Sequence, residues 1–306
     1  AEPSSPLPLG RGPGGGLMTD VVFRRGRLLL WGSCLAVAFA LPLVFKSGFL
    51  VSLLCQMGIM VVFALSYNML LGQTGLLSFG HAVYYGLGAF ITMHALNLIG
   101  KAGSPLVTAL LPLAGGLAGL AAGAVLGYVT TKKAGTTFAM ISLGIGELVA
   151  ACALMFPGFF GGEGGVSGNR VVGKGNLLGF TWGPQIEMYW LIVAWAFLAT
   201  VAMFALTQTP LGRMANAVRD NPERAEFVGY DTQRVRYLML ILSGFFAGIA
   251  GGLTALNYEI VTAETLNAHT SGVVLLMTFV GGIGLFYGPI IGAILISVMQ
   301  IVIGGL

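Results

Sequence analysis

Long apolar segments, separated by short polar ones, dominate the pattern along this chain. A helix needs about 20 mostly apolar residues to cross a lipid bilayer. Seven segments suit this requirement, at residues 28–45, 49–71, 76–98, 106–129, 137–156, 188–207 and 237–258. The pattern therefore predicts an all-α, polytopic membrane protein.

The last apolar stretch, residues 271–303, is too long for one simple span. It is interrupted by Gly281, Gly282 and Gly284 and then by a Gly-Pro pair. It fits either a short or re-entrant helix followed by a span, or one broken helix. With the other segments, it brings the prediction to about eight transmembrane or re-entrant helices.

Glycines recur at every fourth position in two of the segments. They are Gly115, Gly119, Gly123 and Gly127 in one segment, and Gly244, Gly248 and Gly252 in the other. In lipid, small residues at this spacing let helix backbones approach closely, because packing replaces the hydrophobic force between helices. We expect these stripes to pack within the chain, and a subunit interface is the alternative.

Composition excludes an ordinary soluble fold. The 306 residues are 56% hydrophobic and 8% charged, whereas soluble domains are about 25% charged. The net charge of +4 does not indicate nucleic-acid binding, because no basic stripe with interleaved aromatics is present. Cys34, Cys55 and Cys152 lie in apolar segments and lack the spacing of a disulfide frame or a metal site.

Residues 1–20 form a Pro- and Gly-rich N-terminal extension that we expect to be disordered. We expect Met18 to be the natural start of the protein. The residues before it would then be a cloning scar or a misread upstream stretch. The transmembrane domain is predicted to cover residues 21–306.

The cationic residues are distributed unequally between the two sides of the membrane. If the N-terminus is cytoplasmic and every segment crosses, 11 of the 15 Lys and Arg residues lie inside. The four outside are Lys46, Lys101, Arg170 and Lys174. Because cytoplasmic loops carry the excess of Lys and Arg, the pattern places the 208–236 loop in the cytoplasm and the 158–187 loop outside.

The 208–236 loop is the one long charged segment, and it contains the signals of a short helix at 222–228. Asn221 is a typical N-cap, and Pro222 suits the first helical position. Two acidic residues near the helix start suit its dipole, and Gly229 is a natural stop. The helix is predicted to present Ala225, Phe227 and Val228. It is either a solvated surface helix or a docking helix for a soluble partner.

Polar residues are concentrated in the segment 72–90, GQTGLLSFGHAVYYGLGAF. They are Gln73, Thr74, Ser78 and His81. Polar groups in hydrocarbon are costly unless they are paired or face water. Two interpretations remain open: these side chains cap and cross-link helices, or they line a transport pathway.

Glu147 lies near the middle of the 137–156 segment. A carboxylate at mid-bilayer costs on the order of 2.5–3.5 kcal/mol, so it must be protonated, paired or exposed to an aqueous cavity. His81 and His94 are its candidate partners, because no Lys or Arg lies at comparable depth. A structural bond and a role in transport are both open.

The segment 168–174, GNRVVGK, matches the first seven positions of a phosphate-binding P-loop. Its eighth position is Gly175, where Ser or Thr should bind magnesium, so we interpret the match as chance. The sequence shows no nucleotide site, no Ser/His/Asp or Cys/His pairing of an active site, and no cofactor site. It is therefore not predicted to be an enzyme.

Several motifs, in order, resemble the permeases of branched-chain amino-acid-type (LivM-like) ABC importers. The family pattern G-x-x-G-x-x-S-x-G-H-A-x-x-x-G-x-G-A is matched from Gly72 to Ala89. TTFAMISLGIGELV resembles a family helix that ends in an acidic residue, here Glu147, and GGEGGVSG resembles the glycine-rich external loop. PLGRMANAVRDNPERAEFVGYDTQRVRYLMLILSGFFAGIAGGL is similar to the coupling loop and next helix, and FVGGIGLFYGPIIGA to the late glycine-proline signature.

The resemblance implies a multi-pass permease subunit of the bacterial cytoplasmic (inner) membrane. It implies a second homologous permease, two cytoplasmic ATP-binding subunits and an external solute-binding protein as partners, with ATP hydrolysis in the partners. The family transports varied solutes, so the resemblance does not fix the substrate. The residues it assigns to the coupling loop are Arg219, Asp220, Pro222, Glu223, Arg224, Ala225, Glu226 and Gly229.

An ion- or proton-coupled secondary transporter is the alternative. Such a carrier needs charged sites at mid-membrane and often has repeated halves, and only Glu147 offers such a charge. Family members usually continue through more hydrophobic sequence after the last motif, whereas this sequence stops at Leu306. Whether a further segment follows is left open.

Overall fold

The structure is a computed structural model that describes residues 31–33, 35–42, 47–99, 104–171 and 181–304. The chain divides into two units, Ala1–Lys46 and Ser47–Leu306. In the first unit, an apolar helix, Trp31–Pro42, lies inside the predicted 28–45 segment. The predicted extension 1–20 and Cys34 lie outside the described residues.

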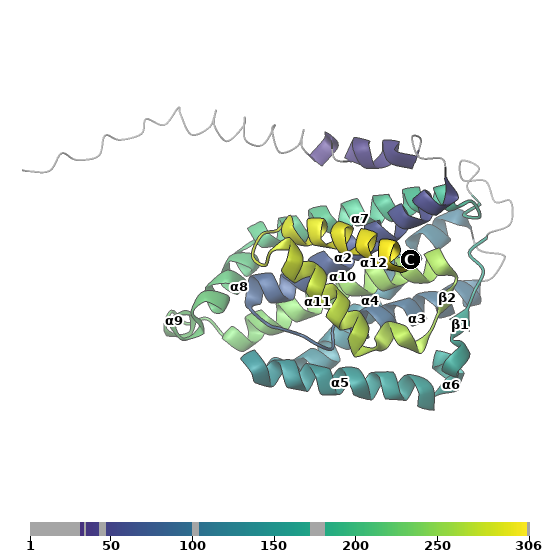
Figure 1. Cartoon of the computed structure of the whole chain (residues 1–306). Coiled ribbons are helices and arrows are strands. Elements are labelled where there is room, and N and C mark those ends of the chain that lie inside the picture. Colours follow the sequence, from purple (N-terminus) through teal and green to yellow (C-terminus); the bar gives the residue numbers. More distant parts are fainter. Residues whose placement is uncertain (1–30, 34, 43–46, 100–103, 172–180, 305–306) are drawn as a thin grey trace, which may run out of the picture. The chain divides into compact units, whose positions relative to one another are not determined.

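Long apolar helices build the second unit (Figure 1). Among the described residues, six helices are long and apolar enough to span a membrane: α2 (Gly48–Thr74), α3 (Ala82–Ile99), α4 (Pro105–Thr130), α5 (Gly135–Met155), α7 (Gln185–Gln208) and α10 (Thr232–Tyr258). They coincide with six predicted segments, which confirms an all-α polytopic membrane protein. α10 begins before the predicted Tyr237, because the Asp231 side chain accepts a hydrogen bond from Arg234 N and caps the helix.

The last apolar stretch is interrupted at the predicted glycines and forms two short apolar helices instead of one long helix. α11 (Ala268–Gly281) and α12 (Gly288–Gly304) pack side by side as a hairpin (Figure 1). In the turn, Gly282 has a φ of 103° and Gly284 a φ of 92°, values that side chains rarely allow. A Cβ on Gly281 would collide with Gly288 O, so the hairpin also needs glycine for its close approach.

The predicted glycine stripes pack α4 against α10. A Cβ on Gly115 would lie 2.6 Å from Gly248 O. A Cβ on Gly88 of α3 would lie 2.6 Å from Gly248 Cα. Neither distance is sterically allowed, so the three backbones approach at positions that only glycine can fill. The stripes therefore serve packing within the chain.

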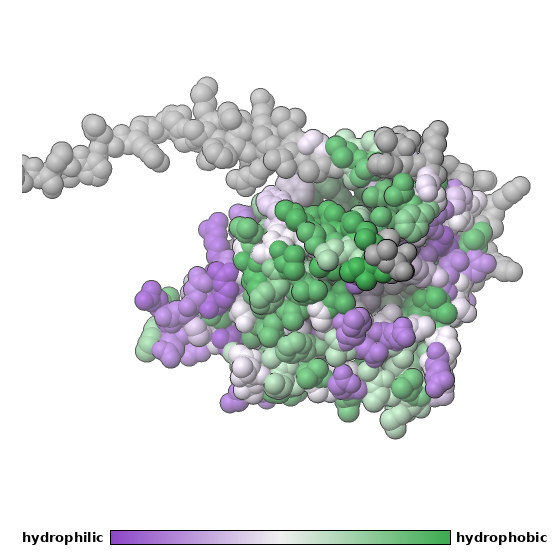
Figure 2. Space-filling model, viewed as in Figure 1, coloured by the Kyte–Doolittle hydropathy of each residue, from purple (hydrophilic) through white to green (hydrophobic). Residues whose placement is uncertain are grey.

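Short elements gather at the two ends of this bundle (Figure 1). One end holds α6 (Pro157–Phe160), η2 (Gly162–Gly164), β1 (Val166–Ser167) and β2 (Ile260–Val261), and η3 (Ala263–Leu266) follows β2. β1 and β2 are antiparallel, with Val166 opposite Val261. The other end holds α8 (Pro210–Asp220) and α9 (Pro222–Phe227). Figure 2 shows a mostly hydrophobic surface between the two ends, with hydrophilic residues gathered at the α8–α9 end and others at the opposite end and low in the view.

Candidate functional site

The 208–236 loop folds into two consecutive capped helices. At α9, the Asn221 side chain accepts a hydrogen bond from Arg224 N at 2.9 Å, and Pro222 occupies the first turn. The helix ends at Phe227, one residue earlier than predicted, and Gly229 has a φ of 97°. The cap, the start and the glycine stop agree with the predicted helix. The preceding helix, α8, is capped by Thr209, whose side chain accepts a hydrogen bond from Gly212 N.

The three apolar residues that the α9 segment was predicted to present are not all exposed. Phe227 is 90% exposed and Val228 is 71% exposed, but Ala225 is only 5% exposed. The prediction that Ala225 is presented to a partner is therefore wrong. A six-residue helix must turn one side toward its own chain, and the small Ala225 lies on that side, where α9 packs against α8 and α10.

Two polar contacts fasten this helix pair to the spanning helices. Arg219, at the end of α8, donates a hydrogen bond to Gly72 O at the end of α2, and it forms an ion pair with Asp220 at 2.9 Å. Thr232 Oγ1, at the start of α10, donates to Glu226 Oε1 at 2.7 Å. Glu223 and Arg224 are exposed. The helix pair is thus connected to both α2 and α10.

His81 and Ser78 belong to a buried polar core between α2, α3 and α10. His81 Nε2 lies 3.1 Å from Ser66 Oγ, and Ser243 Oγ of α10 donates to Ser66 O at 2.6 Å. Tyr67 OH donates to Ser78 O at 3.0 Å, and its ring packs edge-on against His81. These contacts join three helices, so His81 and the Ser78 backbone cross-link the bundle.

Residues 75–81 connect α2 to α3 without a regular helix. Two serines from other helices bond this region: Ser142 Oγ accepts from Phe79 N at 3.1 Å, and Ser271 Oγ accepts from Ala82 N at 2.9 Å. A Cβ on Gly80 would collide with Ser142 O. Irregular backbone at membrane depth must be covered by protein or by a water-filled path. Here α5 and α11 provide protein cover.

The other predicted pathway residues lie apart from this core. Thr74 Oγ1 bonds Leu70 O of its own helix. Gln73 is buried, and its Oε1 has no hydrogen-bond partner among the described residues. Glu147 lies exposed on α5, next to Leu148, which is 63% exposed.

Neither of the two histidines named as candidate partners of Glu147 contacts it. His81 contacts Ser66, and His94 Nε2 lies 2.6 Å from Phe159 O. Within the described residues, neither histidine is paired with the carboxylate. The helical position of Glu147 turns it to the outer side of α5, a direction that sequence depth alone could not reveal.

Arg170 has a role that its sequence position, a charge in an external loop, does not reveal. It is 6% exposed. Its guanidinium donates to Trp182 O at 2.8 Å, to Leu256 O at 2.9 Å and to Asn257 O at 2.7 Å, and it also reaches Gln185 Oε1 at 3.1 Å. The carbonyls at 256 and 257 end α10, where helices leave acceptors unsatisfied.

Charge and burial act on Arg170 in opposite directions. Burial lowers the pKa of the guanidinium, and the nearby Glu259 carboxylate raises it. Glu259 Oε1 also accepts a hydrogen bond from Arg170 N at 2.9 Å. The sequence signal that could have identified Arg170 is a lone arginine in a glycine-rich loop. Arg170 lies in the segment 168–174, which matches part of a P-loop. The described residues of this segment follow β1 and are bonded to α10, so they do not form an open phosphate-binding loop.

The apolar spans, the helical hairpin of α11 and α12, and the capped helix pair at one polar end define a polytopic α-helical membrane protein. Residues 49–306 match the family described as "Branched-chain amino acid transport system / permease component". The match covers most of the chain, and the chain belongs to this family.

Similar proteins come from bacteria and an archaeon. The chain is 28% identical over 286 residues to the "High-affinity branched-chain amino acid transport system permease protein LivM" of Escherichia coli (strain K12), with 87% of this chain and 66% of that protein covered. It is 24% identical over 282 residues to the "Probable branched-chain amino acid transport permease protein LivM" of Methanocaldococcus jannaschii, with 82% and 80% covered. A 69-residue match, 30% identical, joins 22% of the chain to 22% of the "Guanosine ABC transporter permease protein NupQ" of Bacillus subtilis. No solved structure matches.

Proposed function

We propose that this chain is the membrane-spanning permease subunit of an ATP-driven ABC importer for branched-chain amino acids or related small polar solutes. The family and the names of its relatives support this function. None of them is described as an ion- or proton-coupled carrier. ATP hydrolysis belongs to partner subunits, and this chain supplies the passage.

The importer is placed in the bacterial cytoplasmic membrane with the N-terminus inside. The distribution of Lys and Arg supports this orientation. It puts α8 and α9 in the cytoplasm and the β1–β2 end outside. An external solute-binding protein then delivers solute to the β1–β2 end, and two ATP-binding subunits dock at the α8–α9 end.

The proposal that α9 couples the permease to the ATP-binding subunits rests on Phe227, which is exposed on a capped helix that is held to the bundle. A side chain that is 90% exposed gains stability when a partner pocket covers it, because aromatic anchors dominate docking energies. Val228 beside it enlarges the apolar contact. The bonds from Arg219 to Gly72 O and from Thr232 to Glu226 then transmit movement of α9 to α2 and α10.

Glu147 supports the presence of a second permease subunit. In a lone chain, the carboxylate on the outer side of α5 would face lipid, at a cost of about 2.5–3.5 kcal/mol. A homologous subunit packed on this side of α5 would cover it or enclose a water-filled path beside it. Gln73, with its unbonded Oε1, is a separate residue that we assign to the lining of a transport pathway.

The coupling proposal is tested by Phe227→Ser. Loss of an aromatic anchor should weaken ATPase docking by about 2 kcal/mol, or roughly 30-fold. The measurements are co-purification of the ATP-binding subunits and ATP hydrolysis in liposomes, stimulated by the solute-binding protein loaded with leucine.

The matched control is Val171→Ser, which removes an apolar side chain that is 45% exposed at the opposite end. It should leave co-purification unchanged. Ala225 is unsuitable for this purpose, because a charge there would disturb the chain's own packing. If the Phe227→Ser complex assembles normally and keeps full stimulation, α9 is not the coupling helix.

A further inference from the structure

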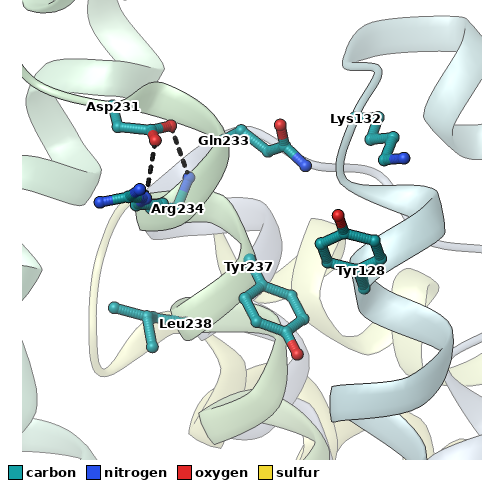
Figure 3. Close-up of a pocket in the computed structure, with 7 residues that line it drawn as sticks. All are labelled: Tyr128, Lys132, Asp231, Gln233, Arg234, Tyr237 and Leu238. Carbon is teal, nitrogen blue, oxygen red and sulfur yellow. Dashed lines mark hydrogen bonds and ion pairs between the residues drawn. The ribbon is translucent and has the colours of Figure 1, made fainter.

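A pocket of about 530 Å³ opens where the last turn of α4 meets the first turn of α10 (Figure 3). Its lining residues are Tyr128, Lys132, Asp231, Gln233, Arg234, Tyr237 and Leu238. Both helices are membrane spans, so the pocket lies where spans leave the hydrocarbon. Tyrosines are enriched at this depth, since the ring suits hydrocarbon and the hydroxyl suits water.

Several hydrogen-bond donors in the pocket remain available. Lys132 Nζ lies 4.8 Å above the Tyr128 ring centre and has no hydrogen-bond or ion-pair partner among the described residues. Arg234 Nε pairs with Asp231 at 2.9 Å, but no described residue binds the outer guanidinium nitrogens. In Figure 3, Gln233 lies between the Arg234 and Lys132 sides of the pocket. The lining thus offers two cations, of which Asp231 neutralises one in part.

The surface next to these donors is apolar. On α4, Val125 is 72% exposed and Val129 is 58% exposed, and on α10, Leu238 is 47% exposed. Tyr237 OH is already used, because it donates to Ala124 O at 2.8 Å. The pocket therefore has a cationic, hydrogen-bonding part that is continuous with a hydrophobic helix surface.

We propose that this pocket binds the phosphate headgroup of an anionic phospholipid, with the acyl chains lying along the exposed apolar sides of α4 and α10. A phosphate diester is an acceptor with one negative charge, and it complements Lys132, Arg234 and the positive N-terminal end of α10. The apolar surface complements acyl chains and offers nothing to a free phosphate ion. The continuity of the two surfaces favours a lipid over a soluble anion.

The proposal requires membrane embedding and not the coupling role of α9. The test is native mass spectrometry of the assembled complex after exchange into phosphatidylglycerol or phosphatidylcholine. The wild-type complex should retain more phosphatidylglycerol than phosphatidylcholine. The double variant K132Q/R234Q should lower that retention roughly 30-fold, since each cation near a membrane surface contributes on the order of 1 kcal/mol.

The matched control is K133Q/R213Q, which removes two exposed cations that do not line the pocket. Its retention of phosphatidylglycerol should stay within about twofold of wild type. If the two double variants lose phosphatidylglycerol equally, the lipid is held by diffuse attraction to surface cations and not at a specific site, and the proposal is overturned. Equal retention of the two lipids by the wild-type complex would overturn it as well.

Two further outcomes identify other occupants. If inorganic phosphate displaces bound phosphatidylglycerol, the pocket is a site for a soluble anion, and the lipid proposal fails. If K132Q/R234Q loses the ATP-binding subunits while lipid retention is unchanged, a protein partner covers the pocket. Failure of the coupling proposal in Phe227→Ser leaves lipid retention unaffected, so the two proposals fail separately.

Discussion

Two arginines, one at each end of the bundle, satisfy helix-terminal carbonyls in different settings. Arg170 is 6% exposed and donates to the carbonyls of Leu256 and Asn257 at the end of α10. Arg219 has a side chain that is 33% exposed, and it donates to Gly72 O at the end of α2. Both supply charge-assisted bonds where helices leave carbonyls unpaired.

The difference lies in how much else holds each arginine. Arg170 is bound by acceptors from several segments, so the β1–β2 end is locked by many simultaneous contacts. Arg219 has one backbone acceptor on α2 and an exposed ion pair. Exposed ion pairs contribute little. The arginine of the α8–α9 end thus makes fewer contacts than the arginine of the β1–β2 end.

The largest effect is expected for Arg170→Met. The substitution leaves several buried carbonyls without donors, and the expected cost is about 3–5 kcal/mol of stability. Thermal unfolding in detergent measures it. The stability of Arg170→Lys should fall between that of the wild type and that of Arg170→Met, because an ammonium cannot reproduce the planar, forked hydrogen bonding of a guanidinium.

Lys133→Gln is the control for Arg170, since it removes an exposed cation and should change stability by less than about 0.5 kcal/mol. A melting temperature for Arg170→Met as high as that of the control would show that the β1–β2 end is not locked by this residue.

A smaller effect on stability is expected for Arg219→Gln, about 1–2 kcal/mol, because one charge-assisted bond and one exposed ion pair are lost. Its effect on coupling should be larger than its effect on folding. Leucine transport per ATP hydrolysed should fall while the ATP-binding subunits stay bound. Arg213→Gln, an exposed cation on α8, should keep the wild-type ratio. An unchanged ratio in Arg219→Gln would mean that the contact with Gly72 transmits nothing.

The smallest effect is expected for Gly229→Ala, at the stop of α9. Gly229 has a φ of 97° and open space around it, so alanine should cost about 1 kcal/mol through backbone strain alone. Gly144→Ala is the matched control, because Gly144 also has open space but lies within helix α5. It should be neutral or gain up to ~1 kcal/mol. Equal melting temperatures for the two variants would show that the turn tolerates a side chain.

The sequence by itself determined the features that depend on neighbouring residues. Lipid-facing helices must be apolar along their length, so segment hydrophobicity located the spans. Asn221, Pro222 and Gly229 fixed the limits of α9 because caps and stops act within one turn. Glycines at every fourth position predicted close helix packing within the chain, and the structure shows that α4 and α10 are the helices concerned.

Only the tertiary structure decided which way side chains point and what distant segments cover. The burial of Ala225 depends on how α9 packs on α8 and α10, and the outward position of Glu147 depends on which side of α5 meets the bundle. Arg170 gains its role from carbonyls more than eighty residues away. Such contacts join segments that no local pattern connects. Their energies depend on the enclosure of each group, and only the folded chain creates that enclosure.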